Sequence, residues 1–295
     1  GYQMTLFDIP ATEHVVNVAS VPQRSPFRYP GGKTWLVPLI RKWLTSLVKS
    51  PSLFVEPFAG GGIVGLTVGF EGLADHVVLV ELDKQIAAVW QTILDGNAEW
   101  LAQRILEFDL SLSNVKDTLS SDAADIREEA FRTILKNRTY HGGILAPGSS
   151  LIKNGENGKG IKSRWYPETL AKRIRAIGRF RDRFTFICGD GIEVMTQHSR
   201  RRHVAFFIDP PYTAGGVNSK RAGTRLYTHH EIDHELLFAT AERVQGDVLL
   251  TYDDSPDVRD LADNHSFVVK TVAMKNTHHA KMTELLIGRN LDWVS

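Results

Sequence analysis

The sequence predicts an α/β protein whose sheet is mostly parallel and ends in an antiparallel pair of strands, with a helical insertion in the chain. Two observations lead to this fold class. Seven short apolar segments are spread along the 295 residues, and several are continuous apolar runs, as in strands buried on both faces. A helical pattern follows most of them, which is typical of parallel strands joined by helices.

The expected strands cover residues 53–56, 76–82, 183–188, 204–209, 247–252, 266–274 and 284–290. The expected helices cover residues 34–48, 63–71, 84–96, 191–198, 231–244 and 256–263. The last two strands have no helical pattern between them, so we expect them to form the antiparallel pair.

Residues 97–182 interrupt the alternation and are expected to form the insertion. They are helical and polar, and they contain the stretch NGENGKG at 154–160, which is typical of an exposed loop. The α/β domain then consists of residues 26–96 and 183–295. Residues 1–25 show weak periodicity and contain two prolines, which predicts a flexible N-terminal tail.

The composition is that of an ordinary soluble globular protein, with 42% hydrophobic and 23% charged residues. The chain has no run of 18 apolar residues to predict a transmembrane helix, and no secretion signal at its N-terminus. The single cysteine, Cys188, excludes a disulfide framework and a cysteine-based zinc site, and the eleven histidines show no ligand spacing. We therefore expect a cytoplasmic protein that holds no metal and contacts no membrane.

The net charge is only +1, but the charges are unevenly distributed. Residues 95–130 hold nine acidic and three basic side chains, whereas residues 151–183 hold ten basic and three acidic ones. A second basic cluster is Arg200, Arg201 and Arg202. Because a phosphate backbone responds to the local field, these segments are candidates for nucleic-acid contact; the alternative is a solvated surface.

A glycine-rich turn joins a predicted strand to a predicted helix in LFVEPFAGGGIVGL, residues 53–66. Gly60, Gly62 and Gly65 satisfy the pattern G-x-G-x-x-G, which brings a ligand close to the backbone at a helix N-terminus. Glu81 and Asp83 stand at the end of the next predicted strand, where an acid can bind ribose hydroxyls. The pattern indicates a nucleoside-containing cofactor, either a dinucleotide or S-adenosylmethionine; the alternative is a turn that only packs a helix on the sheet.

Two other turns extend this pattern. FRYPGGK, residues 27–33, places a second glycine turn and a lysine before the first predicted helix. FICGD, residues 186–190, ends a predicted strand on Asp190, whose carboxylate could accept a hydrogen bond from an adenine amino group. Each could also be a plain turn.

The stretch IDPPY, residues 208–212, ends a predicted buried strand on a stiff turn. A proline fixes φ, has no N–H and holds the residue before it extended. Asp209 and Pro210 therefore present two rigid acceptors, a carboxylate and a carbonyl, and Tyr212 adds an aromatic face. Together they could accept both N–H bonds of an exocyclic amine while the heterocycle stacks on the ring. Because α/β sheets bind ligands at the carboxyl ends of strands, we favour a catalytic element over a capped turn.

These motifs together resemble the Dam-like, D12 class of N6-adenine DNA methyltransferases. FRYPGGK, EPFAGGG, VELD, FICGD, IDPPY and KMTELLIGRN occur in the family order over about residues 26–290, and LKNRTYHGG, residues 135–143, is similar to the family's Asn-Arg segment. The resemblance implies a Rossmann-like, S-adenosylmethionine-dependent methyltransferase fold with a seven-stranded sheet. It implies site-specific methyl transfer to N6 of a flipped-out adenine in double-stranded DNA, by a cytoplasmic enzyme encoded by a bacterium, phage or plasmid.

The resemblance also assigns residues to three sets. The catalytic set, which would hold the target adenine, is Asp209, Pro210, Pro211 and Tyr212. The cofactor set is Tyr29 and Lys33 for the methionine end, Glu56, Phe58, Gly60 and Gly62 for the loop, Glu81 for the ribose in preference to Asp83, and Asp190 for the adenine. The DNA-binding set, within the 97–182 target-recognition insertion and the loop after the catalytic turn, is Asn137, Arg138, Tyr140, Lys162, Arg164, Lys220, Arg221 and Arg225. Tyr140 or Trp165 would stack on bases or wedge beside them.

The chain departs from the family pattern between Asn137 and Arg164 and in the long loop GGVNSKRAGTR, residues 215–225, which leaves the recognised DNA sequence open. The alternatives are an RNA adenine or N4-cytosine methyltransferase, a nicotinamide dehydrogenase, and a catalytically silent DNA-binding protein; the last two do not account for IDPPY. Further expected partners are a cognate restriction endonuclease and a sliding clamp, whose short docking peptide resembles QMTLF, residues 3–7.

Overall fold

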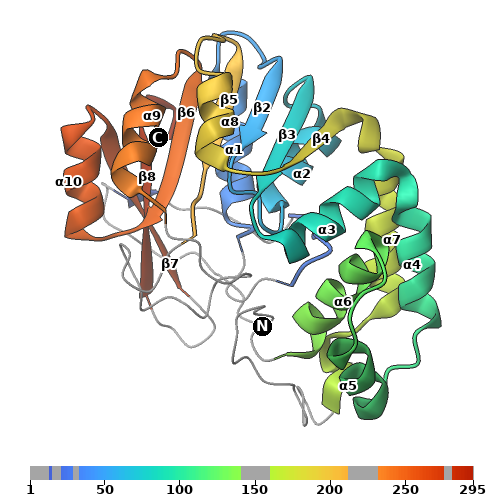
Figure 1. The fold of residues 1–295 in the computed structure, drawn as a ribbon. Coiled ribbons are helices and arrows are strands. Elements are labelled where there is room, and N and C mark those ends of the chain that lie inside the picture. Colours follow the sequence, from blue (N-terminus) through green and yellow to red (C-terminus); the bar gives the residue numbers. More distant parts are fainter. Residues whose placement is uncertain are drawn as a thin grey trace.

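The computed structural model describes residues 13–14, 21–28, 33–140, 160–211, 232–275 and 281–294. Within them one eight-stranded sheet has the order β1-β7-β8-β6-β5-β2-β3-β4 (Figure 1). The strands are β1 (Glu13–His14), β2 (Leu53–Glu56), β3 (His76–Glu81), β4 (Phe184–Cys188), β5 (Val204–Ile208), β6 (Asp247–Asp253), β7 (Val268–Lys275) and β8 (Lys281–Gly288). Strand β8 runs antiparallel to β6 and β7, and every other pair is parallel. The predicted fold class is therefore confirmed.

The helices of the α/β domain lie between the strands, as the sequence predicts. They are α1 (Leu36–Ser46), α2 (Ile63–Glu71), α3 (Lys84–Thr92), α8 (Gly191–Gln197), α9 (His234–Arg243) and α10 (Pro256–Asn264), with a 3-10 turn η6 (Asp292–Val294) near the end of the chain. The helix expected at 84–96 instead ends at Thr92 and continues as a π-helical turn, η1 (Ile93–Asn97). Gly96 has φ 97° there, which breaks the regular helix before the insertion starts.

Both faces of the sheet are buried, which accounts for the continuous apolar runs. Phe206 packs in the core under α8, α9 and α10, and Phe207 in the core under α1, α2 and α3. Both side chains are at most 1% exposed. Neighbouring residues of a strand point to opposite faces, so a strand covered by helices on both sides needs apolar residues at every position.

The insertion is helical and packs on the α/β domain through a continuous core. It contains α4 (Ala98–Glu107), α5 (Leu112–Ser120), α6 (Ile126–Thr139), the 3-10 turns η3 (Gly160–Arg164) and η4 (Arg181–Arg183), and α7 (Pro167–Arg179). Helix α6 packs against α3 and α7 against α4, beside the β4 edge of the sheet (Figure 1). Helix α7 buries Leu170, Ala171, Ile174 and Ile177, the stripe of an amphipathic helix.

The N-terminal segment contains one element that the sequence does not predict. Strand β1 lies in the expected tail and pairs with β7 through Glu13↔Thr271 and His14↔Val272. Two residues carry too little periodicity to identify a strand. No helix of the described residues is long and apolar enough to span a membrane.

The strand order places a ligand site at one point of the sheet. From β2 the chain moves outward to β3 and β4, and then returns to add β5 and β6 on the other side of β2. The carboxyl ends of β2 and β5 therefore border the crevice where open α/β sheets bind ligands. The EPFAGGG and IDPPY motifs begin at these two strand ends.

Candidate active site

The carboxylate of Asp209 is held by two side chains from distant parts of the sequence. Thr251 on β6 donates a hydrogen bond to Oδ1 over 2.9 Å, and Nζ of Lys33 lies 3.4 Å from Oδ2. The register of β5 and β6 pairs Ile208 with Leu250, so Asp209 and Thr251 are the next residues along both strands. The structure thus brings the lysine of FRYPGGK to the acid of IDPPY, and adds a threonine that the motifs do not contain.

The rest of the catalytic turn is partly described. Pro210 is buried and Pro211 is half-buried at the rim of a cavity. Tyr212, and Tyr29 of the cofactor set, lie outside the described residues. The stiff Asp-Pro-Pro backbone therefore stands at the carboxyl end of β5, at the edge of the crevice, as the sequence predicts.

The glycine loop between β2 and α2 is closely packed against Trp90 of α3. Gly62 has φ 68°, and a Cβ added to it would lie 2.7 Å from the Trp90 ring. The Trp90 indole N–H donates to the carbonyl of Gly60 over 2.9 Å. Gly65 lets α2 approach the sheet, since its Cβ would lie 2.5 Å from Leu79. The glycines serve a left-handed turn and close packing.

Glu81, the last residue of β3, holds this loop by a hydrogen bond to its backbone. Its Oε1 accepts a hydrogen bond from the Gly60 N–H over 3.0 Å, and its Oε2 accepts from the Asp83 N–H over 2.8 Å. Burial raises the pKa of the Glu81 carboxyl to about 7, against the lowering effect of these backbone N–H groups. Asp83 caps α3, its Oδ1 accepting from the N–H groups of Gln85 and Ile86. Glu81 lines the cavity described below and Asp83 does not, which favours Glu81 as the residue that meets a ligand.

Glu56 lies beneath the loop and does not line the cavity described next. Its Oε1 accepts from the Gly65 N–H over 3.1 Å, and its side chain is 4% exposed. Burial raises the pKa of Glu56 well above its ordinary value, and the nearby charge of Asp209 raises it further. In this structure Glu56 supports the loop from inside, whereas the sequence pattern predicts a cofactor-binding residue.

A cavity of about 210 Å³ opens between the strand ends and helices α8 and α9. Predicted residues Phe58, Glu81 and Asp190 line it together with Pro211. The motifs do not predict the apolar wall formed by Leu82, Ile192, Ile232 and Leu236. Leu82 and Ile192 could have been found, because each closely follows a strand end that carries a predicted acid. Apolar walls that also carry carboxylates suit a flat heterocycle joined to a ribose.

Asp190 is exposed and also caps α8. Its Oδ1 accepts from the Ile192 N–H over 2.8 Å. The second carboxylate oxygen can therefore still accept a hydrogen bond from a ligand at the cavity. Within the described residues no group of three or more His, Cys, Asp or Glu side chains is placed to hold a metal ion.

Asn137 and Arg138, predicted to contact DNA, have buried side chains. The Asn137 amide accepts from the Arg28 N–H over 2.7 Å and donates to the Arg28 carbonyl over 3.0 Å. The Arg138 guanidinium donates to the carbonyls of Pro26 and Arg164. Burial lowers the pKa of Arg138 to about 9, and the charges of Arg173 and Arg28 lower it further. Both side chains hold residues 26–28, where FRYPGGK begins, and lie away from the surface in this structure.

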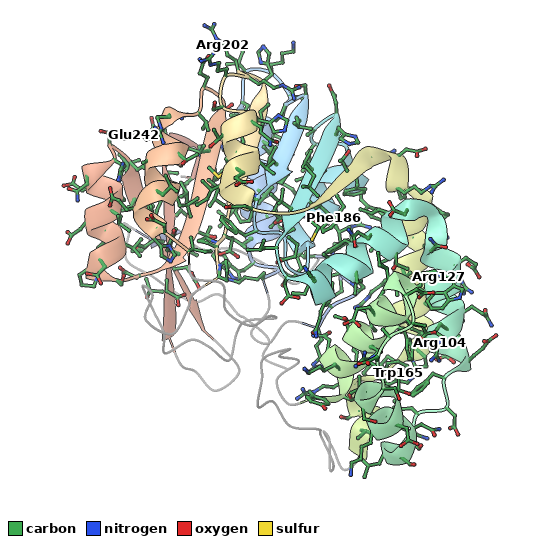
Figure 2. The ribbon with its side chains drawn as sticks, in the orientation of Figure 1. Arg104, Arg127, Trp165, Phe186, Arg202 and Glu242 are labelled. Atoms are coloured by element: carbon green, nitrogen blue, oxygen red, sulfur yellow. The ribbon has the colours of Figure 1, made fainter. Side chains whose placement is uncertain are left out.

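The remaining DNA-binding candidates are divided between surface, interior and undescribed parts of the chain. Lys162 is exposed, and Tyr140 and Arg164 are half-buried. Trp165 is only 4% exposed and packs edge-on against Phe108, so it belongs to the core of the insertion and not to a base-stacking surface (Figure 2). Lys220, Arg221 and Arg225 lie outside the described residues.

The class of protein is a Rossmann-like methyltransferase dependent on S-adenosylmethionine. It is defined by the strand order, by the glycine loop with Glu81, and by the Asp-Pro-Pro turn beside the cavity. A family model described as D12 class N6 adenine-specific DNA methyltransferase matches residues 29–276. The chain belongs to this family, and its methyl donor is S-adenosylmethionine.

Solved structures of methyltransferases resemble the chain distantly. A precorrin-6y C5,15-methyltransferase from Geobacter metallireducens aligns with 8% identity over 94% of this chain and 97% of its own, with a TM-score of 0.40. An rRNA methyltransferase from Streptomyces viridochromogenes aligns with 11% identity over 93% of both chains, also with a TM-score of 0.40. A comparison with curated protein sequences found no match.

Proposed function

We propose that this protein transfers the methyl group of S-adenosylmethionine to N6 of an adenine in double-stranded DNA, at a specific site and after the base has left the duplex. The observation that carries the proposal is the Asp209 carboxylate, fixed by Thr251 and Lys33 beside the Pro210 carbonyl. It stands at the switch point of the sheet, next to the cavity lined by Glu81 and Asp190. Flipping the base costs a few kcal/mol of unstacking.

The cofactor supplies, when bound, a methyl group on a positively charged sulfur. Phe58, Leu82 and Ile192 would hold its adenine, Asp190 would accept from the adenine amine, and Glu81 would accept from the ribose hydroxyls. The cavity fits this group because its walls are apolar and the charged side chains that line it are carboxylates, which suit these donors. Ribose hydroxyls that donate to the Glu81 carboxylate would offset the burial that raises its pKa.

Asp209 and the Pro210 carbonyl act on the target base. Each accepts one N–H of the exocyclic amine, which withdraws the nitrogen lone pair from the ring and directs it to the methyl group. The Asp209 carboxylate would also accept the proton that the amine loses once it carries the methyl group. Because both acceptors are held by rigid backbone and by Thr251, alignment and fixed dipoles supply most of the rate.

The DNA would lie across the insertion and the carboxyl edge of the sheet. Exposed Lys162 and the half-buried Tyr140 and Arg164 would meet its backbone, with Lys220, Arg221 and Arg225 as further contacts. Asn137 and Arg138 would act indirectly, by positioning residues 25–28. A cognate restriction endonuclease, and a sliding clamp bound through residues 3–7, remain proposed partners of this enzyme.

The test is methylation of mixed-sequence DNA with tritiated S-adenosylmethionine, followed by identification of the modified nucleoside. We expect N6-methyladenine from the wild type and none from Asp209→Ala, while calorimetry shows that this variant still binds S-adenosylhomocysteine. Asp209→Asn is the matched control for shape, because it keeps one acceptor oxygen and loses the charge. N4-methylcytosine, or label in RNA but not in DNA, would support the alternative substrates instead.

A further inference from the structure

The opposite edge of the sheet carries a basic surface that the proposed reaction does not use. We define the basic edge as Lys49, Arg200, Arg201, Arg202 and His203, all of which are exposed. The turn that contains the three arginines leads into β5 at its amino end, and Asp209 follows β5 at its carboxyl end. At about 3.3 Å per residue, six residues separate His203 from Asp209 by about 20 Å. Figure 2 shows Arg202 projecting from this edge, away from the insertion.

Backbone hydrogen bonds hold the basic edge in a fixed shape. The carbonyl of His203 accepts from the N–H and hydroxyl of Ser52, over 2.9 and 3.1 Å. The carbonyl of Ser199 accepts from the Gln245 N–H over 2.7 Å. These bonds tie the turn to the start of β2 on one side and to β6 on the other. The arginine side chains therefore extend from a rigid support.

The edge continues into a groove of about 540 Å³. Lys49, His203 and Arg289 line it together with Trp43 and Trp293. A Cβ on Gly246 would lie 3.2 Å from the Arg201 carbonyl, and the Gly246 carbonyl accepts from the Arg289 guanidinium over 2.6 Å. The arginine turn and the groove are thus one continuous surface.

The charge of this surface is positive and mostly uncompensated. Arg289 is used internally, since it also donates to the carbonyls of Ala241 and Val244 at the end of α9. The acids that face the groove are Asp247 and Asp292. Among the described residues Lys49, Arg200 and Arg202 form no ion pair, while Arg201 contacts Nδ1 of His198 over 3.1 Å. With a net charge of +1 for the chain, such a local excess favours a polyanion.

We propose that the basic edge binds a second segment of duplex DNA while the first lies at the carboxyl edge. Arginines match phosphate oxygens in a bidentate geometry, so the three arginines of this turn suit a phosphate backbone. The choice of DNA as the polyanion rests on the proposed function. A protein that holds two segments can transfer between them without returning to solution, which shortens the search for its site.

The test asks whether one protein molecule holds two duplexes. A biotinylated mixed-sequence duplex is fixed on beads, the full chain is added, and a fluorescent second duplex is offered. We expect the wild type to retain the second duplex and the triple variant Arg200→Ser, Arg201→Ser, Arg202→Ser to retain about a tenth as much or less. The variant should bind the first duplex and methylate it as the wild type does.

The control variant removes the same number of charges elsewhere, by Arg41→Gln, Arg259→Gln and Lys270→Gln, and should retain the second duplex fully. Light scattering of the free protein excludes retention through protein oligomers. The proposal would be overturned if the triple variant retained the second duplex as well as the wild type does, or if the wild type retained none. It would also be overturned if the wild type retained anionic lipid vesicles but not DNA. Failure of the proposed function would appear separately, as absence of methyl incorporation, which the capture assay does not measure.

Discussion

The Thr251 hydroxyl donates a hydrogen bond to Oδ1 of Asp209 over 2.9 Å, and Thr251 is fully buried. This bond leaves Oδ2 to face Lys33 and the crevice. It therefore sets the rotation of the carboxylate that would accept the target amine. Thr251 and Asp209 are 42 positions apart in the sequence, and the pairing of β5 with β6 brings them together.

We expect Thr251→Val to lower kcat by about tenfold to a hundredfold, because a hydrogen bond to a charged group contributes about 1.5–3 kcal/mol. Thr251→Ser keeps the hydroxyl and should retain most of the activity. Initial methylation rates of the wild type and the two variants, measured at saturating DNA and cofactor, check this effect. Equal rates for the valine and serine variants would show that the hydroxyl does not position Asp209.

Two glycines with nearly the same backbone conformation provide a paired test of the cofactor loop. Gly62 has φ 68° and Gly72 has φ 65°, but an added Cβ meets Trp90 at Gly62 and open space at Gly72. We expect Gly72→Ala to cost about 1 kcal/mol of unfolding free energy, from left-handed strain alone. Gly62→Ala should cost a further 1–3 kcal/mol, roughly, because the Trp90 ring must move.

Chemical denaturation measures these losses of unfolding free energy. Calorimetry measures the affinity of each variant for S-adenosylhomocysteine. Only Gly62→Ala should weaken binding, since Trp90 holds the Gly60 carbonyl of the loop. Equal losses of stability in the two variants would mean that the loop relaxes without cost and that Trp90 does not define its shape.

The sequence predicts the sheet and the motif positions because both depend on local patterns. Apolar runs identify buried strands, and the stiff Asp-Pro-Pro turn and the glycine loop identify the crevice. Thr251 could not be found in this way, since a threonine in a strand resembles any other until the register is known. The family resemblance assigns Asn137 and Arg138 to DNA contact, and nothing in their local sequence indicates that these polar side chains are buried. The carbonyl and N–H groups of the 25–28 segment that make their burial favourable are more than 100 residues away.

The Glu81 carboxyl predicts a pH dependence of stability. Burial raises its pKa in the folded chain from 4.5 to about 7, so the folded state binds this proton more tightly than the unfolded state. Its contribution to stability is therefore fully present below about pH 4.5 and is lost as the pH rises through 7. The loss is on the order of 3 kcal/mol.

Comparison with Glu81→Gln isolates this effect, because other buried acids such as Glu56 titrate alike in both proteins. We expect the unfolding free energy of the wild type, minus that of the variant, to fall between about pH 4.5 and 8. Denaturant titrations at several pH values measure it. A difference that stays constant over this range would contradict the raised pKa.

The basic residues of 160–183 differ in their availability to DNA. Lys162, Lys172 and Arg179 are the candidates at the surface of the insertion. Arg175 forms a bidentate ion pair with Glu99 over 2.7 and 2.8 Å. Arg183 donates to the carbonyls of Gly69 and Phe70 at the end of α2. Arg175 and Arg183 therefore stabilise the insertion and its junction with the sheet. Lys162, Lys172 and Arg179 are therefore among the side chains that we expect to bind phosphates.

We therefore expect DNA affinity to fall steeply as the salt concentration rises. The triple change Lys162→Gln, Lys172→Gln, Arg179→Gln should flatten the slope of log K against log salt by up to about 3. Each phosphate that is no longer neutralised accounts for roughly 0.9 of this change. The control is the double change Glu99→Gln, Arg175→Gln, which removes an exposed ion pair without altering the net charge. It should keep the wild-type slope, and its stability should change by less than about 1 kcal/mol because exposed pairs contribute little. Fluorescence anisotropy with a mixed-sequence duplex at several salt concentrations gives the slopes. If the triple variant kept the wild-type slope, the insertion would not be the main phosphate-binding surface, and the basic residues between 212 and 231 would be the next to substitute.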